Sequence, residues 1–316
     1  MHRVTLPLWG LLALAACRPP AAPDDGRLRV AVSVPPQAYF VERIGGDRVN
    51  VEVMIPPGYS HAEYPLTPGK VEALSRARLY VKVGHPSFEF ERDQIDPVLA
   101  TLPGIRVVDM SRGMRFLEDE TGEGHGDPGH GHEGGDPHVW VAPGTVAVAA
   151  KNIAAALEQA DPAHAAEYRA NLQAFEADVA ALDREIRARL AGREGAEFMV
   201  YHPTWGYFAE EYGLKQVAIE AEGKEPSAAR LIQLIDAARR DHVRVIFVQA
   251  GFPRKSAQVI ADAVGARVLV ADPQERDWLG NLRRVTRELE EALPPSPPDP
   301  LSHHTTLPPW ERGNHA

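Results

Sequence analysis

The first part of the chain alternates short apolar runs with segments of helical periodicity. Strands are predicted at 28–34, 49–55, 79–83 and 105–108. Helices are predicted at 37–44, before two glycines, and after Thr67, which caps a helix with Pro68 at its first position. Because strands that alternate with helices form parallel sheets, this pattern predicts an α/β lobe.

The same alternation returns after residue 192. Strands are predicted at 198–201, 216–219, 243–248 and 267–270, and helices at 205–212, 227–240, 256–264 and 278–293. The sequence therefore predicts a second α/β lobe with its own parallel sheet.

Between the two lobes lies one long helical segment, predicted at 162–191. Asp161 and Pro162 open it as cap and first residue, and Gly192 ends it. Apolar residues recur every three or four positions, at Ala165, Tyr168, Leu172, Phe175, Val179, Leu182, Ile186 and Leu190. At 1.5 Å per residue this helix is about 45 Å long, enough to span two lobes. A coiled-coil dimer would give a similar spacing. A rigid helix joining the lobes of a monomer fits a single segment between two α/β halves better.

Residues 1–16 read as an export signal, with His2 and Arg3 before an apolar run too short to cross a bilayer. The run ends in Leu-Ala-Ala followed by Cys17, which resembles the lipobox of bacterial lipoproteins. Cys17 is the only cysteine, so no disulfide forms within the chain. We expect an exported protein, periplasmic or on the cell surface, with a lipid on Cys17 that anchors it to a membrane. The sequence does not identify the membrane that carries the anchor.

The charge of the chain is acidic, with 34 lysines and arginines against 44 acids. Removal of residues 1–16 takes away Arg3 and leaves a net charge of about −11. This balance excludes nucleic acid and anionic membrane surfaces as partners, whereas a cation suits it.

Composition and periodicity together divide the chain into six segments. They are a signal peptide at 1–16, a tether at 17–26, an N-terminal lobe at 27–142 that includes a histidine-rich loop at 122–135, a helical linker at 143–192, a C-terminal lobe at 193–293, and a disordered tail at 294–316.

The segment from 122 to 140 concentrates histidine among glycines and acids, at His125, His130 and His132. Imidazoles on such a glycine-rich loop can collect a metal ion at neutral pH. The segment then re-enters ordered structure, where Pro137 restricts the backbone before His138 and the apolar Val139 and Trp140 hold that histidine against a packed surface.

Other candidate ligands follow predicted strands. His61 follows the strand at 49–55, His202 follows the strand at 198–201, and Asp277 follows the strand at 267–270. Ligands bind beyond the carboxyl ends of strands in open α/β sheets, so loops from the two lobes can face each other across a cleft. Together with His138, these residues give three imidazoles and one carboxylate, a tetrahedral set that suits Zn²⁺.

The sequence resembles the solute-binding proteins of bacterial zinc and manganese ABC transporters, in particular the zinc-binding ZnuA-like group, across roughly residues 28–293. The matching segments are PGYSHAEYPLTP (57–68), DPHVW (136–140), YHPTWGYFAEEYGL (201–214), EPSAARLIQLI (225–235), VRVIFVQAGF (243–252) and DWLGNL (277–282). This resemblance implies two α/β lobes joined by one rigid long helix, with the metal held between them and passed to a membrane permease. It also implies that the histidine-rich loop collects metal.

Position by position, the resemblance places His138 and His202 on the second and third ligands of the family. A histidine at the third position marks the zinc group, since manganese members have a carboxylate there. Asp277 matches the carboxylate ligand, whereas Asp272, before Pro273, is expected in a turn.

The first ligand departs from the family pattern. The family has a proline followed by histidine in this loop, whereas here His61 stands one place early and Ala62 occupies the expected position. Either the loop adjusts to bring His61 in, or Glu63 or water fills the position.

Three alternative functions remain: a manganese-binding homologue, a metal-dependent adhesin of the same fold, and a zinc hydrolase. A hydrolase needs a water position on the metal and a nearby general base. No HExxH motif is present, so we expect a binding protein and not an enzyme.

Overall fold

The structure is a computed structural model, and it describes residues 26–61, 64–117, 135–220, 224–249 and 251–293. Several predicted features lie outside these residues: the signal peptide, Cys17, most of the tether, Glu63, the loop histidines His125, His130 and His132, and the tail at 294–316.

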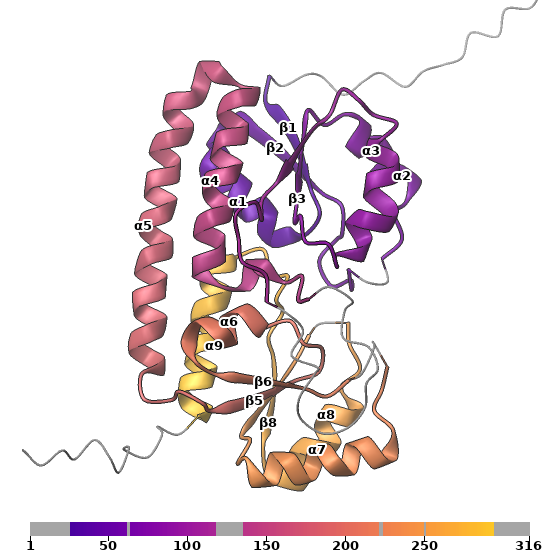
Figure 1. The fold of residues 1–316 in the computed structure, drawn as a ribbon, viewed down its shortest axis with the longest axis vertical. Coiled ribbons are helices and arrows are strands. Elements are labelled where there is room, and N and C mark those ends of the chain that lie inside the picture. The colour runs from indigo at the N-terminus through magenta and orange to yellow at the C-terminus, as the bar shows by residue number, and fades with distance from the viewer. Residues whose placement is uncertain (1–25, 62–63, 118–134, 221–223, 250, 294–316) are drawn as a thin grey trace, which may run out of the picture.

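The first lobe is built on four parallel strands, β1 (Leu28–Val32), β2 (Val49–Val53), β3 (Leu79–Lys82) and β4 (Arg106–Asp109), in the order β2-β1-β3-β4. Helices α1 (Pro35–Gly45), α2 (Pro68–Ser75) and α3 (Asp96–Leu99) flank this sheet (Figure 1). The predicted cap is present, because the Thr67 side chain accepts a hydrogen bond from the backbone N–H of Lys70. Two short helical turns, η1 (Gly46–Arg48) and η2 (Phe90–Ile95), complete the lobe.

The second lobe repeats this topology with strands β5 (Glu197–Val200), β6 (Lys215–Ala218), β7 (Val245–Val248) and β8 (Arg267–Val270), all parallel and in the order β6-β5-β7-β8. Its helices are α6 (Gly206–Tyr212), α7 (Ala228–Arg240) and α8 (Lys255–Val264). The predicted α/β class with two parallel sheets is confirmed.

A layer of long helices lies along one side of both sheets (Figure 1). It contains α4 (Pro143–Ala160), η3 (Val139–Val141) at its start, η4 (Pro162–His164), α5 (Ala165–Leu190) and the C-terminal α9 (Trp278–Ala292). Helix α5 packs against α4, α1 and α9, and it runs the height of both lobes in Figure 1. The long joining helix is therefore confirmed, and its apolar stripe packs within the chain and not against a coiled-coil partner.

The start of the long helix differs from the prediction. Asp161 makes no capping hydrogen bond, and α5 begins only at Ala165, after the turn η4. The Asp161 carboxylate instead accepts hydrogen bonds from the Tyr168 hydroxyl and from His164 Nδ1, both at 2.7 Å. These two hydrogen bonds to residues later in the chain stabilise the connection between α4 and α5.

Aromatic side chains from three elements meet where the two lobes join. The ring of Phe40, in α1, lies 6.0 Å from Phe175 in α5 and 5.4 Å from Trp278 in α9. All three side chains are fully buried and belong to one apolar core that includes residues of both sheets. The two lobes therefore share one apolar core where they join.

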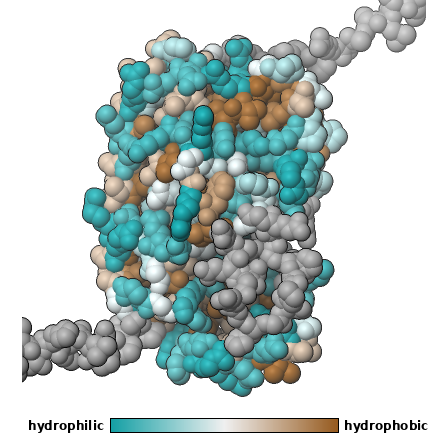
Figure 2. Space-filling view, viewed as in Figure 1, coloured by the Kyte–Doolittle hydropathy of each residue, from teal (hydrophilic) through white to brown (hydrophobic). Residues whose placement is uncertain are grey.

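The surface is largely polar on the face shown in Figure 2, where teal side chains surround smaller apolar areas. Among the described residues, the large apolar side chains that are exposed are scattered: Tyr59, Val107, Ile232, Val259 and Val270. Within the same residues, no helix combines the length and the apolar character that a membrane span requires.

Candidate metal centre

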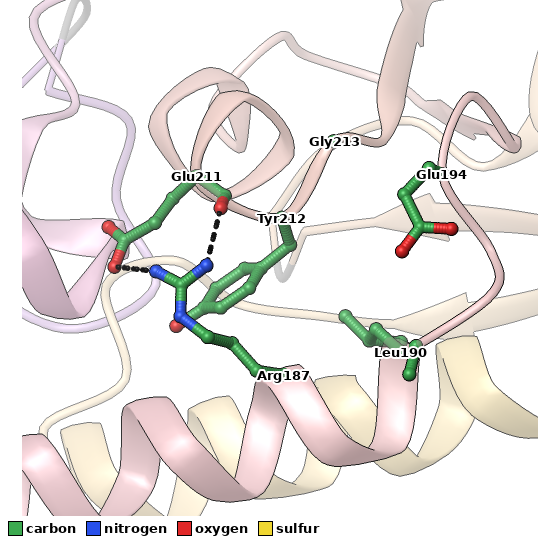
Figure 3. A pocket seen from close by; sticks show the side chains of 7 residues that line it. Arg187, Leu190, Glu194, Glu211, Tyr212 and Gly213 are labelled. Atoms are coloured by element: carbon green, nitrogen blue, oxygen red, sulfur yellow. Dashed lines mark hydrogen bonds and ion pairs between the residues drawn. The ribbon is translucent and has the colours of Figure 1, made fainter.

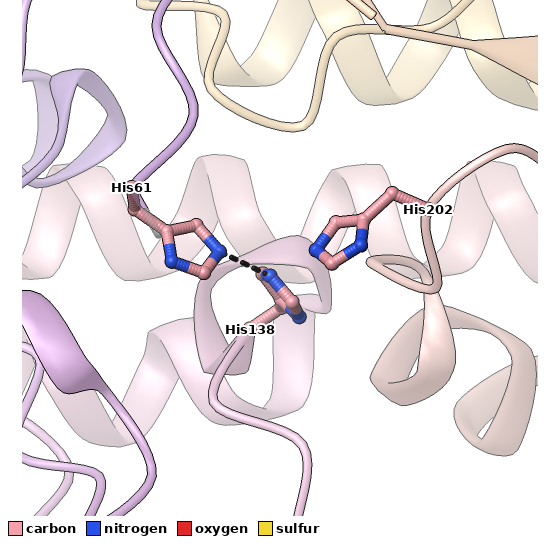
Figure 4. Close-up of side chains that lie close together, drawn as sticks. All are labelled: His61, His138 and His202. Carbon is pink, nitrogen blue, oxygen red and sulfur yellow. Dashed lines mark hydrogen bonds between the residues drawn. The ribbon is translucent and has the colours of Figure 1, made fainter. Parts of the chain in front are cut away.

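Three histidines from different parts of the chain meet between the lobes (Figure 4). His61 lies in the loop after β2, His138 immediately precedes η3, and His202 follows β5. Their side chains are almost completely buried, with exposures of 5%, 0% and 9%. Nε2 of His61 lies 2.8 Å from Nε2 of His138, and the possible ligand atoms of all three lie within 4.8 Å of one another.

These separations fit the shell of a tetrahedral zinc ion. With Zn–N bonds of 2.0–2.1 Å, two ligand nitrogens lie about 3.3 Å apart. The spacings in the structure lie on both sides of that value, between 2.8 Å and 4.8 Å. Small shifts of the three rings therefore suffice to place their nitrogens around one ion. The one-residue offset of His61 in its loop does not keep it away from the cluster.

His138 is held by the acid two residues before it. Oδ1 of Asp136 lies 2.6 Å from Nδ1 of His138 and also accepts the backbone N–H of His138 at 2.9 Å. A carboxylate on Nδ1 keeps the proton there, so the lone pair of Nε2 points at the other two histidines. This is the usual arrangement behind a metal-binding histidine.

His202 is held in the same way from a neighbouring strand. Its Nδ1 pairs with Oε1 of Glu220, a buried acid that follows β6. The imidazole is stacked on the ring of Phe252, with centroids 5.5 Å apart and an angle of 12°. The acid fixes the tautomer and the aromatic ring fixes the plane, so Nε2 of His202 is directed at the cluster.

Trp140 forms the floor beneath two of the histidines. Its ring lies 5.3 Å from His138 and 6.5 Å from His61, edge-on to both. Its indole N–H donates to the carbonyl of Pro273, and the Trp278 indole donates to the carbonyl of Trp140. Residues of the second lobe therefore hold the floor of the site in place.

The loops of the two lobes also touch at the rim. Gly251 precedes Phe252 and has a φ of +85°, and a Cβ there would lie 2.7 Å from the carbonyl oxygen of Gly58. Only glycine fits this approach. The loop of His61 and the loop that carries the ring stacked on His202 therefore meet in backbone contact.

Asp277 does not join the three histidines, contrary to the prediction. Its side chain is exposed and caps α9, where Oδ1 accepts the backbone N–H of Gly280 at 3.1 Å. The segment that suggested a ligand is the first turn of a helix, in which Trp278 packs inward and its neighbour faces solvent. Asp272 lies in a turn as expected, with Oδ1 accepting the N–H of Gln274, and burial raises the pKa of its carboxyl.

Asp136 and Glu220 are the functional residues that sequence reasoning missed. The sequence could have indicated the contact of Asp136 with His138, because an acid two residues before a histidine, with proline between them, can turn back onto the imidazole. The contact between Glu220 and His202 can be predicted only when β5 and β6 are known to be neighbours. Glu220 then follows β6 as His202 follows β5. Two acids behind three imidazoles are a set that suits a divalent cation.

A separate surface pocket lies where α5 ends against α6 (Figure 3). The Arg187 guanidinium lies over the Tyr212 ring at 5.2 Å and pairs with the Glu211 carboxylate at 3.6 Å. Glu211 in turn accepts the N–H of Gly144, in the first turn of α4, and burial raises the pKa of its carboxyl. None of the residues that line this pocket is a histidine or a cysteine, and its polar side chains join α4, α5 and α6.

Comparisons with known proteins agree with this arrangement. Zinc-binding lipoprotein AdcA of Streptococcus pneumoniae is 28% identical over 87% of this chain, which spans only 56% of that protein. The high-affinity zinc uptake system protein ZnuA of Bacillus subtilis is 29% identical over 84% of this chain and 88% of its own.

Solved structures give the same result. A crystal structure of ZnuA matches with a TM-score of 0.77 and 36% identity, covering 84% of this chain and 99% of that one. A ZnuA deletion mutant with zinc bound matches with a TM-score of 0.76 and 36% identity, covering 86% and 100%. The family model described as zinc-uptake complex component A, periplasmic, matches residues 30–292. The chain therefore belongs to the ZnuA family of zinc-uptake components.

Proposed function

We propose that this protein captures Zn²⁺ between its two lobes outside the cytoplasm and delivers it to the permease of an ABC transporter. The observation that carries the proposal is the buried group of three imidazoles, each presented from a different segment. The zinc-binding names of its relatives support the same cargo.

The ligands in this proposal are Nε2 of His61, His138 and His202. Three ligands leave one position of a tetrahedron, which Glu63 or water fills. Asp277 is left out of the ligand set because it caps α9. Asp136 and Glu220 hold two of the imidazoles and compensate the charge of the ion.

The same donor set favours zinc over manganese. Imidazole nitrogen is a good ligand for zinc, whereas manganese prefers carboxylate and water oxygens. Among the described residues the gathered group consists of histidines alone, and the acids Asp136 and Glu220 are hydrogen-bonded to imidazole nitrogens. An acid engaged in this way is poorly placed to act as the general base of a hydrolase, which favours binding over catalysis.

The remaining parts of the proposal come from sequence and family. They are export by residues 1–16, a lipid on Cys17 that anchors the chain to a membrane, and a monomer that meets its permease at that surface. The division into lobes at 27–142 and 193–293 with a helical linker at 143–192 also belongs to this proposal.

Metal analysis after exhaustive dialysis tests the proposed cargo. We expect one tightly held Zn²⁺ per chain that resists competition by a chelator, and preferential loading of zinc when equal amounts of manganese are offered. Manganese retained in preference to zinc would contradict the proposal. Glu63→Ala then identifies the fourth position: a loss of affinity assigns it to Glu63, and unchanged affinity assigns it to water.

A further inference from the structure

The turn η2 is a π-helix, a rare form that occurs mostly as single turns and often at functional sites. It follows the Gly84–Phe88 loop at the carboxyl end of β3, and the Phe88 ring packs against the ring of His61 at 5.0 Å. The wider turn brings side chains of η2 to face the loop that carries His61. This element has no role in the ligand set described above.

The side chain of Gln94, in η2, forms hydrogen bonds with two backbone atoms of that loop. Its Oε1 accepts the N–H of Leu66 at 2.6 Å, and its Nε2 donates to the carbonyl of Tyr64 at 3.0 Å. A side-chain amide that bonds one donor and one acceptor replaces the hydrogen bonds of a neighbouring strand. The ring of Tyr64 also packs against Phe90 of η2, with centroids 6.4 Å apart.

The grip on Tyr64 reaches His61 through the backbone. The N–H of Tyr64 donates to the carbonyl of Ser60 at 3.1 Å, and Ser60 directly precedes His61. Fixing Tyr64 therefore also restrains Ser60, the residue next to His61. The ring of Phe88 packs against the His61 imidazole and restricts its rotation.

The turn η2 is itself fastened to the sheet by a buried acid. Glu91 accepts the N–H of Val83 at 2.6 Å, the N–H of Gly84 at 3.0 Å and the hydroxyl of Ser33. These donors lie at the carboxyl ends of β1 and β3. Burial outweighs them and raises the pKa of Glu91 to about 7. The result is a continuous chain of contacts from the central strands to His61.

We propose that Gln94 is a positioning residue for His61, which sets the imidazole opposite His138 by holding the backbone of Tyr64 and Leu66. The inference rests on the proposed zinc site. Carboxylates contact Nδ1 of His138 and of His202, and the hydrogen bonds of Gln94 restrain the backbone beside His61. The proposed first ligand, which stands one place early in its loop, thus has Gln94 as its positioning residue.

The test is a double-mutant cycle on zinc affinity, measured by competition with a chelator. We expect Gln94→Ala to weaken zinc binding about 10-fold, since outer partners of metal ligands are worth 10- to 100-fold. In a His61→Ala background, the same change should alter affinity less than 2-fold, because the group that Gln94 positions is already gone. Gln159→Ala, which removes one surface hydrogen bond between α4 and Arg106 of β4, is the matched control and should leave affinity unchanged.

Two outcomes overturn the inference: unchanged zinc affinity in Gln94→Ala, or an equal loss in both backgrounds, which would mean that Gln94 acts on the fold. Gln94→Glu is the second variant in case the alanine variant fails to fold. It keeps an acceptor for Leu66 but places an oxygen against the carbonyl of Tyr64. The visible spectrum of bound Co²⁺ should shift toward that of His61→Ala in either variant. Failure of the proposed function would be distinct, since the wild-type protein would then bind no zinc tightly.

Discussion

The imidazoles of the site differ in what holds them. His138 and His202 each have a carboxylate on Nδ1, and the loop that carries His61 is held by η2 through Gln94. A carboxylate on Nδ1 makes Nε2 a better ligand and fixes the ring. It also keeps a negative charge near the ion without using a coordination position.

Replacing Asp136 by asparagine isolates this charge. The amide oxygen of Asp136→Asn can still accept from His138, so the ring keeps its place while the charge is lost. We expect zinc affinity to fall about 10-fold, with little change in thermal stability of the metal-depleted protein. Titration of metal-depleted protein against a chelator at pH 7 measures the effect.

The chain offers a matched control for that variant. Asp161 also contacts the Nδ1 of a histidine, His164, at 2.7 Å, but at the corner between α4 and α5. Asp161→Asn should therefore leave zinc affinity unchanged. Equal affinity of Asp136→Asn and wild type would show that orientation alone, and not charge, is what Asp136 supplies.

Residue identities predicted the three imidazoles but not their partners. Histidines that follow strands are visible in the sequence, because strand ends can be predicted from apolar runs. Asp277 was predicted as a ligand because the sequence between β8 and α9 holds three acids, Asp272, Glu275 and Asp277, and spacing alone does not say which one starts a helix. Glu220 was missed because its role depends on strand order, which no local pattern encodes.

At the scale of elements, the ends of the strands were predicted to within two residues. The central strands are mostly buried and produce continuous apolar runs, such as the fully buried β7, which are easy to read. The segment 90–99 was missed. It starts as a π-helical turn with Arg92 and Asp93 exposed, and a π-turn breaks the 3.6-residue period on which helix prediction depends.

The base of the histidine-rich loop is closed by residues outside it. The N–H of Asp136 donates to the carbonyl of Leu117 at 3.2 Å. The Tyr207 hydroxyl, from α6, bridges the two ends by accepting from Leu117 N–H and donating to the carbonyl of Asp136, both at 3.1 Å. Gly135 has a φ of +98° and must remain, because a Cβ there would lie 2.4 Å from Leu117 O. His138 is therefore positioned by this closed base.

Deletion of residues 124–134, with Gly135 kept, should accordingly leave the tight zinc site intact. What should disappear is weaker zinc binding by His125, His130 and His132, whose glycine-rich backbone costs on the order of 1 kcal/mol per residue to fix around a metal. Zinc titration by calorimetry separates the two classes. Loss of the tight class with the loop would mean that a loop histidine is a primary ligand.

At the scale of the whole molecule, the two lobes cannot be treated as independent. One apolar core runs from β1 and β3 through α4, α5 and α9 into the second sheet, and Trp140 bonds to the second lobe at both its indole N–H and its carbonyl. The sequence predicted the long helix that joins the lobes. It did not predict that α9 packs on α5 beside the second lobe, with Trp278 at its start reaching Phe40 of the first, because the contacts with α5 join residues about a hundred positions apart.

A shared core and a metal held by both lobes together predict how zinc changes stability. Only the folded chain brings His61, His138 and His202 together, so zinc stabilises the folded state by mass action. At a free zinc concentration 1,000 times the dissociation constant the gain is about 4 kcal/mol, which corresponds to a rise in Tm on the order of 10 °C for a protein of this size. Because the core is continuous, calorimetry should show one transition that moves as a whole. His202→Ala should lose most of the shift, and a zinc-dependent split into two transitions would contradict the shared core.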